Sequence, residues 1–278
     1  MRPARALALL RLTVGTFFLL RTTPILLPLG FRFAQAPLAG WPARGWHLAA
    51  FGLALPAWTV AALAILRTVA AASFLAGFHA RKAGVIAAAF GWVVLAQDAL
   101  AYVNSIHLLY LSTLLVALAD SSAELALRPE PAASMRSSVW LLRALPMSVY
   151  AFAGLAKLNG EFLSGRALLA FREDGFVRGL IAPLACATPA RAQAASVFVV
   201  IVELALPVLL ALPRTRKLAV GIALVFHATL EVSMHPDVFG WLMIALLLPF
   251  VATDSGADGV KEAVVRADVD GAVRADRG

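Results

Sequence analysis

Charged residues, cysteine and tyrosine are all scarce in this sequence of 278 residues. Charged side chains make up 14% of the chain, against about 25% in soluble domains. Hydrophobic residues make up 61%. A surface with so few charges cannot stay in water, so the composition excludes a soluble globular protein. The single cysteine, Cys186, excludes a disulfide within the chain and a metal cluster built from cysteines.

The basic residues lie mainly in short segments between apolar runs. The formal net charge is +8, which in a soluble protein would favour nucleic acid as a partner. Here Lys and Arg flank hydrophobic stretches at 2–5, 81–82 and 214–217, where they set the orientation of membrane helices instead. We therefore expect no nucleic-acid partner. We expect both termini on the cytoplasmic side of a bacterial inner (plasma) membrane.

Eight apolar stretches are long enough, or nearly so, to cross a bilayer as helices. Their expected bounds are 6–28, 57–78, 83–103, 106–119, 138–158, 193–213, 217–234 and 238–252. We predict an all-α, polytopic transmembrane helical bundle over residues 1–253, without a soluble domain. Residues 254–278 are polar and poor in aromatics, which is typical of a disordered tail.

Two polar features interrupt the apolar pattern. Residues 159–191 mix charged and large apolar side chains, which predicts an amphipathic segment over the end of the fifth span, lying on the membrane surface or re-entering it. Glu203 is expected at mid-membrane in the sixth span. Because charges inside membrane helices pair with one another, we expect Glu203 to be a structural partner of Arg67 or Arg11 rather than a catalytic group.

Lys157 stands at the outer end of the fifth span, before the break at Asn159-Gly160, and has no acidic residue within three positions. Such a lysine can be an anchor whose stem reaches the membrane interface. Counting back by sevens gives Tyr150 and Arg143, and seven residues advance about two helical turns, so the three side chains share one face. A polar face favours a site inside the bundle over a simple anchor.

The expected topology brings further polar residues toward the outer face. His107 opens the fourth span, and Glu231 and His235 end the seventh, with His227 about two turns deeper. The last three share a helical face at i, i+4 and i+8, but eight residues cover about 12 Å, too long for one metal ion to touch all three. We expect no metal, and we expect these residues to converge on a polar pocket near Lys157.

Four blocks of the sequence resemble the membrane domain of the vitamin K-dependent gamma-carboxylases and their bacterial relatives, the horizontally transferred transmembrane domain (HTTM) family. The blocks are LALLRLTVGTFFL at 7–19, LLRALPMSVYAFAGLAKLNGEFLSG at 141–165, ELALPVLLALPRTRKLA at 203–219 and FHATLEVSMHPDVFGWLMIALLLPF at 226–250. They occur in the family order. The resemblance implies a helical membrane domain and an enzyme, a carboxylase/epoxidase-like lyase or an oxidoreductase, acting on a reduced, vitamin K-like quinone.

The resemblance also implies roles for residues. The lysine at the position of Lys157 is regarded in the carboxylases as the base that deprotonates reduced vitamin K, and His227 matches a histidine of the penultimate block. Both are therefore candidate catalytic residues. Arg143 and Tyr150 fall on matching positions of the lysine helix, which makes them candidate cofactor-binding residues.

The sequence departs from the carboxylases in two places. The family has an Asn-His pair just before the fourth span, whereas Asn104 and His107 are separated by two residues; we expect these two to contact the cofactor. The carboxylases continue into a large lumenal portion that helps hold the protein substrate, so carboxylation of a protein glutamate is not expected here. The expected partner is a membrane lipid or isoprenoid quinone. A membrane protein or peptide is a second candidate partner. The alternative is a non-catalytic membrane scaffold or partner subunit that keeps the fold without the chemistry.

Overall fold

The computed structural model describes residues 2–22, 55–96, 104–119, 121–130, 135–177, 179, 181–234 and 238–252. His235 and the tail at 254–278 lie outside these ranges, so the expectations for them stay predictions. Within the described ranges every regular element is a helix, and no strand occurs. The predicted all-α fold class is confirmed.

Five helices are long and apolar enough to cross a membrane. They are α1 (Pro3–Thr22), α2 (Ala57–Ala76), α5 (Met135–Ala156), α9 (Pro189–Ala211) and α10 (Arg216–Met234). The other three expected spans correspond to shorter helices: α3 (Ala80–Leu95), α4 (Asn104–Leu118), and α11 (Phe239–Ala245) with α12 (Leu248–Val251). The fold is that of a multi-pass membrane protein, and the count of eight spans stays a prediction.

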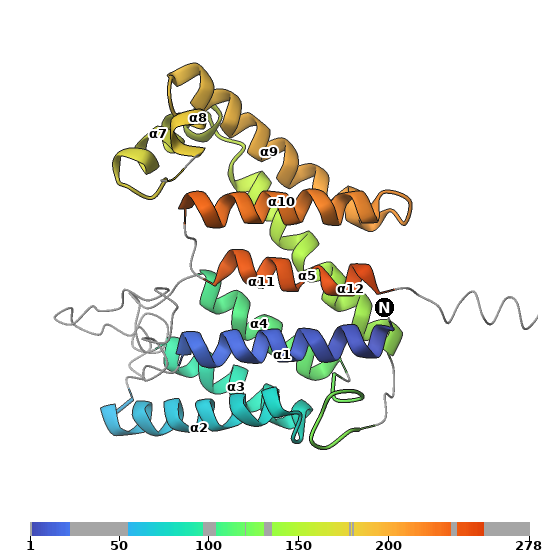
Figure 1. The fold of residues 1–278 in the computed structure, drawn as a ribbon. Helices are drawn as coiled ribbons and strands as arrows, with labels where there is room; N and C mark the ends of the chain where they lie inside the picture. Colours follow the sequence, from blue (N-terminus) through green and yellow to red (C-terminus); the bar gives the residue numbers. More distant parts are fainter. Residues whose placement is uncertain are drawn as a thin grey trace, which may run out of the picture.

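The helices form two groups that α5 connects (Figure 1). In the N-terminal group, α1 to α4 pack against one another. In the C-terminal group, α5 packs on α9, and α9 packs on α10. α11 and α12 lie between α1 and α10 and contact both helices (Figure 1). Since α5 also contacts α4 and α12, its N-terminal part is held by these helices, while its C-terminal end packs on α9.

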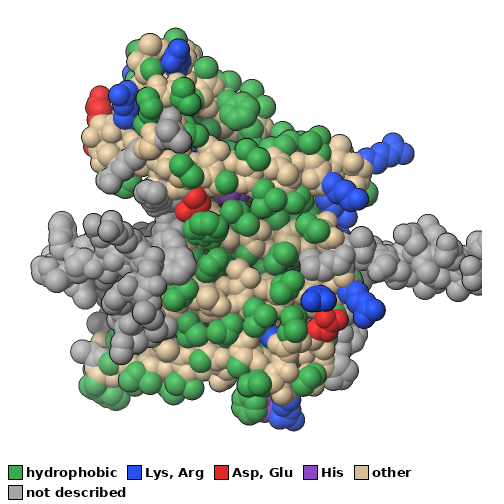
Figure 2. All heavy atoms as spheres, in the orientation of Figure 1, with side chains coloured by type: hydrophobic (Ala, Val, Ile, Leu, Met, Phe, Trp, Pro, Cys, Tyr) green, Lys and Arg blue, Asp and Glu red, His purple; other side chains and the backbone are tan. Residues whose placement is uncertain are grey.

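The outer surface of the helices is rich in large apolar side chains, which is expected of helices that face lipid (Figure 2). Trp58, Phe152, Phe198 and Val225 are among those that are mostly exposed. Lys and Arg side chains gather at the edge where α1 begins and where α9 turns into α10 (Figures 1 and 2). A basic edge beside an apolar surface is typical of the cytoplasmic end of a membrane bundle.

Arg11 is fully buried in α1 and holds the segment that follows α4. Its Nη1 donates to the carbonyl oxygen of Ser121 at 2.9 Å, and its Nη2 donates to the carbonyl oxygen of Leu125. Leu125 has a positive φ of 50°, a strained conformation for a residue with a side chain. The guanidinium therefore satisfies two backbone carbonyls of a tight segment, which is a structural role.

Arg67 plays a similar part in α2, also within the N-terminal group. Its Nη2 donates to the carbonyl oxygen of Thr22 at 2.7 Å, and its Nη1 donates to the hydroxyl of Tyr110 at 3.3 Å.

The expectation that Glu203 pairs with Arg67 or Arg11 is wrong. Glu203 lies on α9, which packs against α5, and its carboxylate contacts Lys157 instead.

The expected amphipathic segment after α5 contains three short helices: α6 (Gly160–Leu163), α7 (Arg166–Glu173) and α8 (Ile181–Ala185). All three pack on α9, and α8 also contacts α10. Val177, Ala182 and Cys186 form a small buried cluster of their own beneath Leu168 and Leu169. The segment thus has one apolar side turned to the bundle, as predicted, while its position at the membrane surface stays a prediction.

Candidate active site

Lys157 directly follows the last residue of α5, where the chain breaks and turns. Asn159 stabilises this break from both sides, because its side-chain amide donates to the carbonyl oxygen of Ala156 at 2.9 Å and its side-chain oxygen accepts from the amide of Phe162 at 2.9 Å. The first bond satisfies a terminal carbonyl of α5, and the second caps α6. The Asn159-Gly160 break therefore holds Lys157 at a defined helix end.

The Lys157 ammonium is paired with the Glu203 carboxylate of α9. Lys157 Nζ lies 2.9 Å from Glu203 Oε1 and 2.8 Å from Oε2, so it bridges both oxygens. It also donates to the carbonyl oxygen of Ala153 at 3.3 Å and lies 5.8 Å from the centre of the Phe162 ring. The side chain of Glu203 is 8% exposed and that of Lys157 is 29% exposed. Glu203 is therefore the more buried member of the pair, and Lys157 is the more exposed member.

A glycine in α5 allows this pair to form. A Cβ at Gly154 would lie 2.7 Å from Leu204 Cδ2, so the Leu204 side chain would have to shift, and 3.3 Å from Glu203 Cβ, which is a tight contact. Small residues let membrane helices approach closely, and here the close approach lies beside Glu203 itself. The contact between α5 and α9 therefore sets the distance between the lysine and the carboxylate.

A second polar pair lies about two turns from Lys157, toward the N-terminus of α5. The hydroxyl oxygen of Tyr150 is 2.7 Å from Nε2 of His227 on α10, and both side chains are almost fully buried. The His227 ring also has edge contacts with Phe226 and Phe239, at ring-centre distances of 5.4 and 6.2 Å. Its Nδ1 is buried and has no hydrogen-bond partner in the part of the chain that the structure describes. Such a buried nitrogen is a natural contact for a hydroxyl of a bound molecule.

Arg143 lies toward the opposite end of α5, on the same predicted polar face, and contacts residues of α12. Its Nε donates to the carbonyl oxygen of Pro249 at 2.9 Å, and its guanidinium lies 5.9 Å from the centre of the Phe250 ring. These contacts tie α5 to α12. The predicted polar stripe is therefore present, but its arginine contacts the end of α12, whereas Tyr150 and Lys157 contact α10 and α9.

Asn104 and His107 belong to the N-terminal group. Asn104 is the exposed first residue of α4, and His107 Nδ1 accepts a hydrogen bond from Trp92 Nε1 of α3 at 3.2 Å. Trp92 in turn packs edge-on against Tyr110, at a ring-centre distance of 6.3 Å. His107 thus contacts α3, whereas Lys157 contacts α9. Whether Asn104 and His107 contact a cofactor stays a prediction.

Glu203 is the site residue that our sequence reasoning assigned to the wrong partner. One signal could have identified the right one, because Lys157 is a cation near the end of one predicted span and Glu203 an anion within the next. Consecutive spans pack together more often than distant ones.

Among the described residues, no group of three or more His, Cys, Asp or Glu side chains is placed to hold a metal ion.

The chain was compared with protein families, curated proteins and solved structures. The model of the HTTM domain matches residues 42–254, which is most of the chain. The comparisons with curated proteins and with solved structures gave no match. The matched range contains all of α2 to α12, including both polar pairs on α5. The chain belongs to the HTTM-domain family, whose domain is that of the vitamin K-dependent gamma-carboxylases.

Proposed function

We propose that this protein is a membrane enzyme that removes a proton from a hydroxyl of a lipid-soluble molecule such as a reduced quinone, with Lys157 as the base. The observation that carries the proposal is the pair between Lys157 and Glu203, two residues of adjacent apolar helices. A lysine that only anchors a helix end does not need a buried carboxylate held against it. The family membership supports the same direction of chemistry.

Glu203 prepares Lys157 for this role. A protonated lysine cannot accept a proton, but transfer of one proton from the ammonium to the carboxylate gives a neutral amine and a neutral acid. Low-dielectric surroundings penalise separated charges, so both forms of the pair, which are neutral overall, are compatible with burial. The amine then takes the hydroxyl proton of the substrate. Lys157 becomes an ammonium, which stabilises the negative charge left on the substrate oxygen.

The residues present fit a hydroxyl-bearing aromatic lipid. Lys157 is the more exposed member of its pair, and the Phe162 ring beside it offers an apolar surface for a ring to pack on. Two turns away, Nδ1 of His227, which has no partner among the described residues, can accept or donate one hydrogen bond. Tyr150 fixes the orientation of the His227 ring through Nε2. A quinone-type lipid, which dissolves in the bilayer, can reach these helices laterally.

The orientation belongs to the same proposal. We infer that both termini lie in the cytoplasm and that the membrane is the bacterial inner membrane, which places Lys157 toward the outer face. The basic edge where α1 begins and α9 turns into α10 supports this orientation (Figure 2). Cysteine substitution at positions 82 and 216 followed by labelling of intact cells tests it. Labelling of either position by a reagent that does not cross the membrane would contradict the proposed orientation.

The experiment that tests the proposed chemistry is Lys157→Arg in purified, lipid-reconstituted protein. Arginine keeps the positive charge and can still pair with Glu203, but it stays protonated and cannot act as a base. The deprotonated hydroquinone is the form that O₂ oxidises, so oxygen consumption reports the proton transfer. We expect it to fall by about 10²–10⁴-fold, the usual contribution of a general base. Lys82→Arg, a change at an exposed lysine of α3, is the matched control and should keep full activity.

Two results would overturn the proposal. One is an active, well-folded Lys157→Arg protein, because arginine cannot supply a base. The other is a wild-type protein that consumes no oxygen with any reduced quinone tested. The non-catalytic scaffold is not favoured by the present observations, because the Lys157–Glu203 pair is intact.

A further inference from the structure

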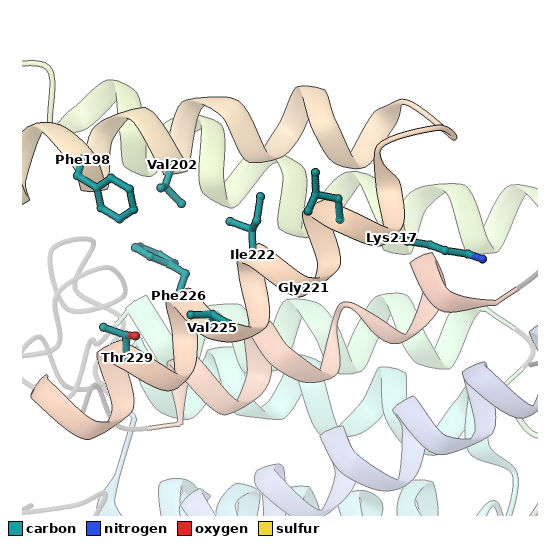
Figure 3. A pocket seen from close by; sticks show the side chains of 9 residues that line it. Phe198, Val202, Lys217, Gly221, Ile222, Val225, Phe226 and Thr229 are labelled. Atoms are coloured by element: carbon teal, nitrogen blue, oxygen red, sulfur yellow. The ribbon is translucent and has the colours of Figure 1, made fainter.

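An open apolar groove lies between α9 and α10, on the lipid-facing side of the C-terminal group. Its volume is about 620 Å³. The residues that form it are Phe198 and Val202 of α9 and Leu218, Ile222, Val225 and Phe226 of α10 (Figure 3). Phe198 and Val225 are 62% and 68% exposed, so the groove opens outward rather than into the core.

The groove is separate from the candidate active site. Phe226 forms part of its wall and has an edge contact with His227, the next residue in the chain, at 5.4 Å between ring centres. Neither Tyr150 nor His227 lines the groove. A molecule in the groove contacts the outside of α9 and α10 and does not touch Lys157 or Glu203, neither of which forms part of the lining.

Gly221 keeps the middle of the groove open. A Cβ built at Gly221 would meet no atom within 4 Å, so the space beside this glycine is empty of protein atoms. Glycine within a helix costs about 0.5–1 kcal/mol relative to alanine. No close helix contact requires Gly221, and the absence of a side chain there leaves the middle of the groove open.

The dimensions and polarity of the groove match one leaflet of a membrane. The lining of α10 runs from Lys217 to Thr229, and twelve residues of helix cover about 18 Å. Half of a hydrocarbon core of about 30 Å is roughly 15 Å. Lys217 lies at one end and its side chain extends away from the apolar residues (Figure 3). Arg214, exposed in the turn before α10, adds a second cation at this end.

We propose that this groove binds a phospholipid with an anionic headgroup, with an acyl chain along α9 and α10 and the phosphate at Lys217. Basic pockets between membrane helices at a cytoplasmic surface are suited to anionic headgroups. The single basic end selects the occupant, because an uncharged isoprenoid quinone would fill the apolar part but gain nothing from the two cations. This proposal does not depend on the proposed enzymatic function.

The test compares two substitutions at Gly221 by native mass spectrometry of the purified full-length protein, with phosphatidylglycerol and phosphatidylcholine supplied in equal amounts. Gly221→Trp places a large side chain in the groove, and its Cβ meets no neighbouring atom, whereas Gly221→Ala adds one methyl group and leaves the groove open. We expect wild type and Gly221→Ala to retain phosphatidylglycerol and Gly221→Trp to lose most of it. Circular dichroism and gel filtration check that all three proteins fold.

A second variant tests the headgroup contact without changing the groove. Lys217→Gln removes the charge at an exposed position in the first turn of α10. The preference for phosphatidylglycerol over phosphatidylcholine should fall about fivefold, the effect of one basic residue at a membrane surface. Equal retention by Gly221→Trp and Gly221→Ala, or an unchanged preference in Lys217→Gln, would overturn the proposal. Retention of added ubiquinone in place of phosphatidylglycerol would overturn it as well.

Discussion

Cations inside the N-terminal group and the Lys157 cation of the C-terminal group have different kinds of partner. In the N-terminal group, Arg11 and Arg67 donate to backbone carbonyls and to a tyrosine hydroxyl. In the C-terminal group, Lys157 is held by the carboxylate of Glu203. An arginine bonded to carbonyls has no proton to exchange, because it stays charged and its partners are not acids. A lysine bonded to a carboxylate can exchange one. The difference separates cations that hold the fold from the cation that is suited to chemistry.

The largest expected loss of stability comes from Arg11→Met. The substitution leaves the carbonyls of Ser121 and Leu125 without their charged donor. Hydrogen bonds to charged groups contribute about 1.5–3 kcal/mol each, so we expect the free energy of unfolding to fall by roughly 3–6 kcal/mol. Thermal unfolding in detergent measures it. Arg128→Met, in the same segment but exposed, is the control and should change stability by less than about 1 kcal/mol. Equal stability of the two variants would contradict a structural role for Arg11.

A smaller loss is expected when the Lys157–Glu203 pair is broken. Lys157→Met leaves the carboxylate of Glu203 without its cation. Removing one partner of a fully buried pair costs about 3–5 kcal/mol, and because Lys157 is 29% exposed we expect about 2–3 kcal/mol. The double variant Lys157→Met with Glu203→Gln removes both charges and should regain most of that stability while staying inactive. A double-mutant cycle measures the coupling between the two residues. Additive losses would show that the two side chains do not interact.

The smallest effect is expected from removing one buried tyrosine hydroxyl in each group. Tyr110→Phe removes the acceptor of Arg67, and Tyr150→Phe removes the partner of His227 Nε2. Each should cost about 1 kcal/mol of stability, the net value of one hydrogen bond. Turnover of a reduced quinone should fall only in Tyr150→Phe, because only this tyrosine orients a residue of the candidate site. If both variants lose activity equally, the distinction between the two groups fails.

The sequence predicted much of the fold because long apolar runs leave few alternatives. Inside a bilayer the backbone must satisfy its own hydrogen bonds, so apolar stretches become helices whatever their partners are. The polar face of α5 followed from helical spacing alone, which put Tyr150 and Lys157 two turns apart on one side. Spacing could not show that Arg143 of the same face contacts α12, because that contact joins residues more than a hundred positions apart.

The sequence by itself determined that this protein is a helical membrane protein, which residues are polar within its helices, and the family resemblance that the HTTM match confirms. Only the tertiary structure decided which polar residues meet. By charge alone, Glu203 could pair with any cation of the predicted spans, among them Arg11, Arg67 and Lys157. The close contact of α5 and α9 at Gly154 selected Lys157, because the strength of a pair depends on the distance between its charged atoms. That distance is set by the packing of the two helices, so the sequence of either helix alone does not determine it.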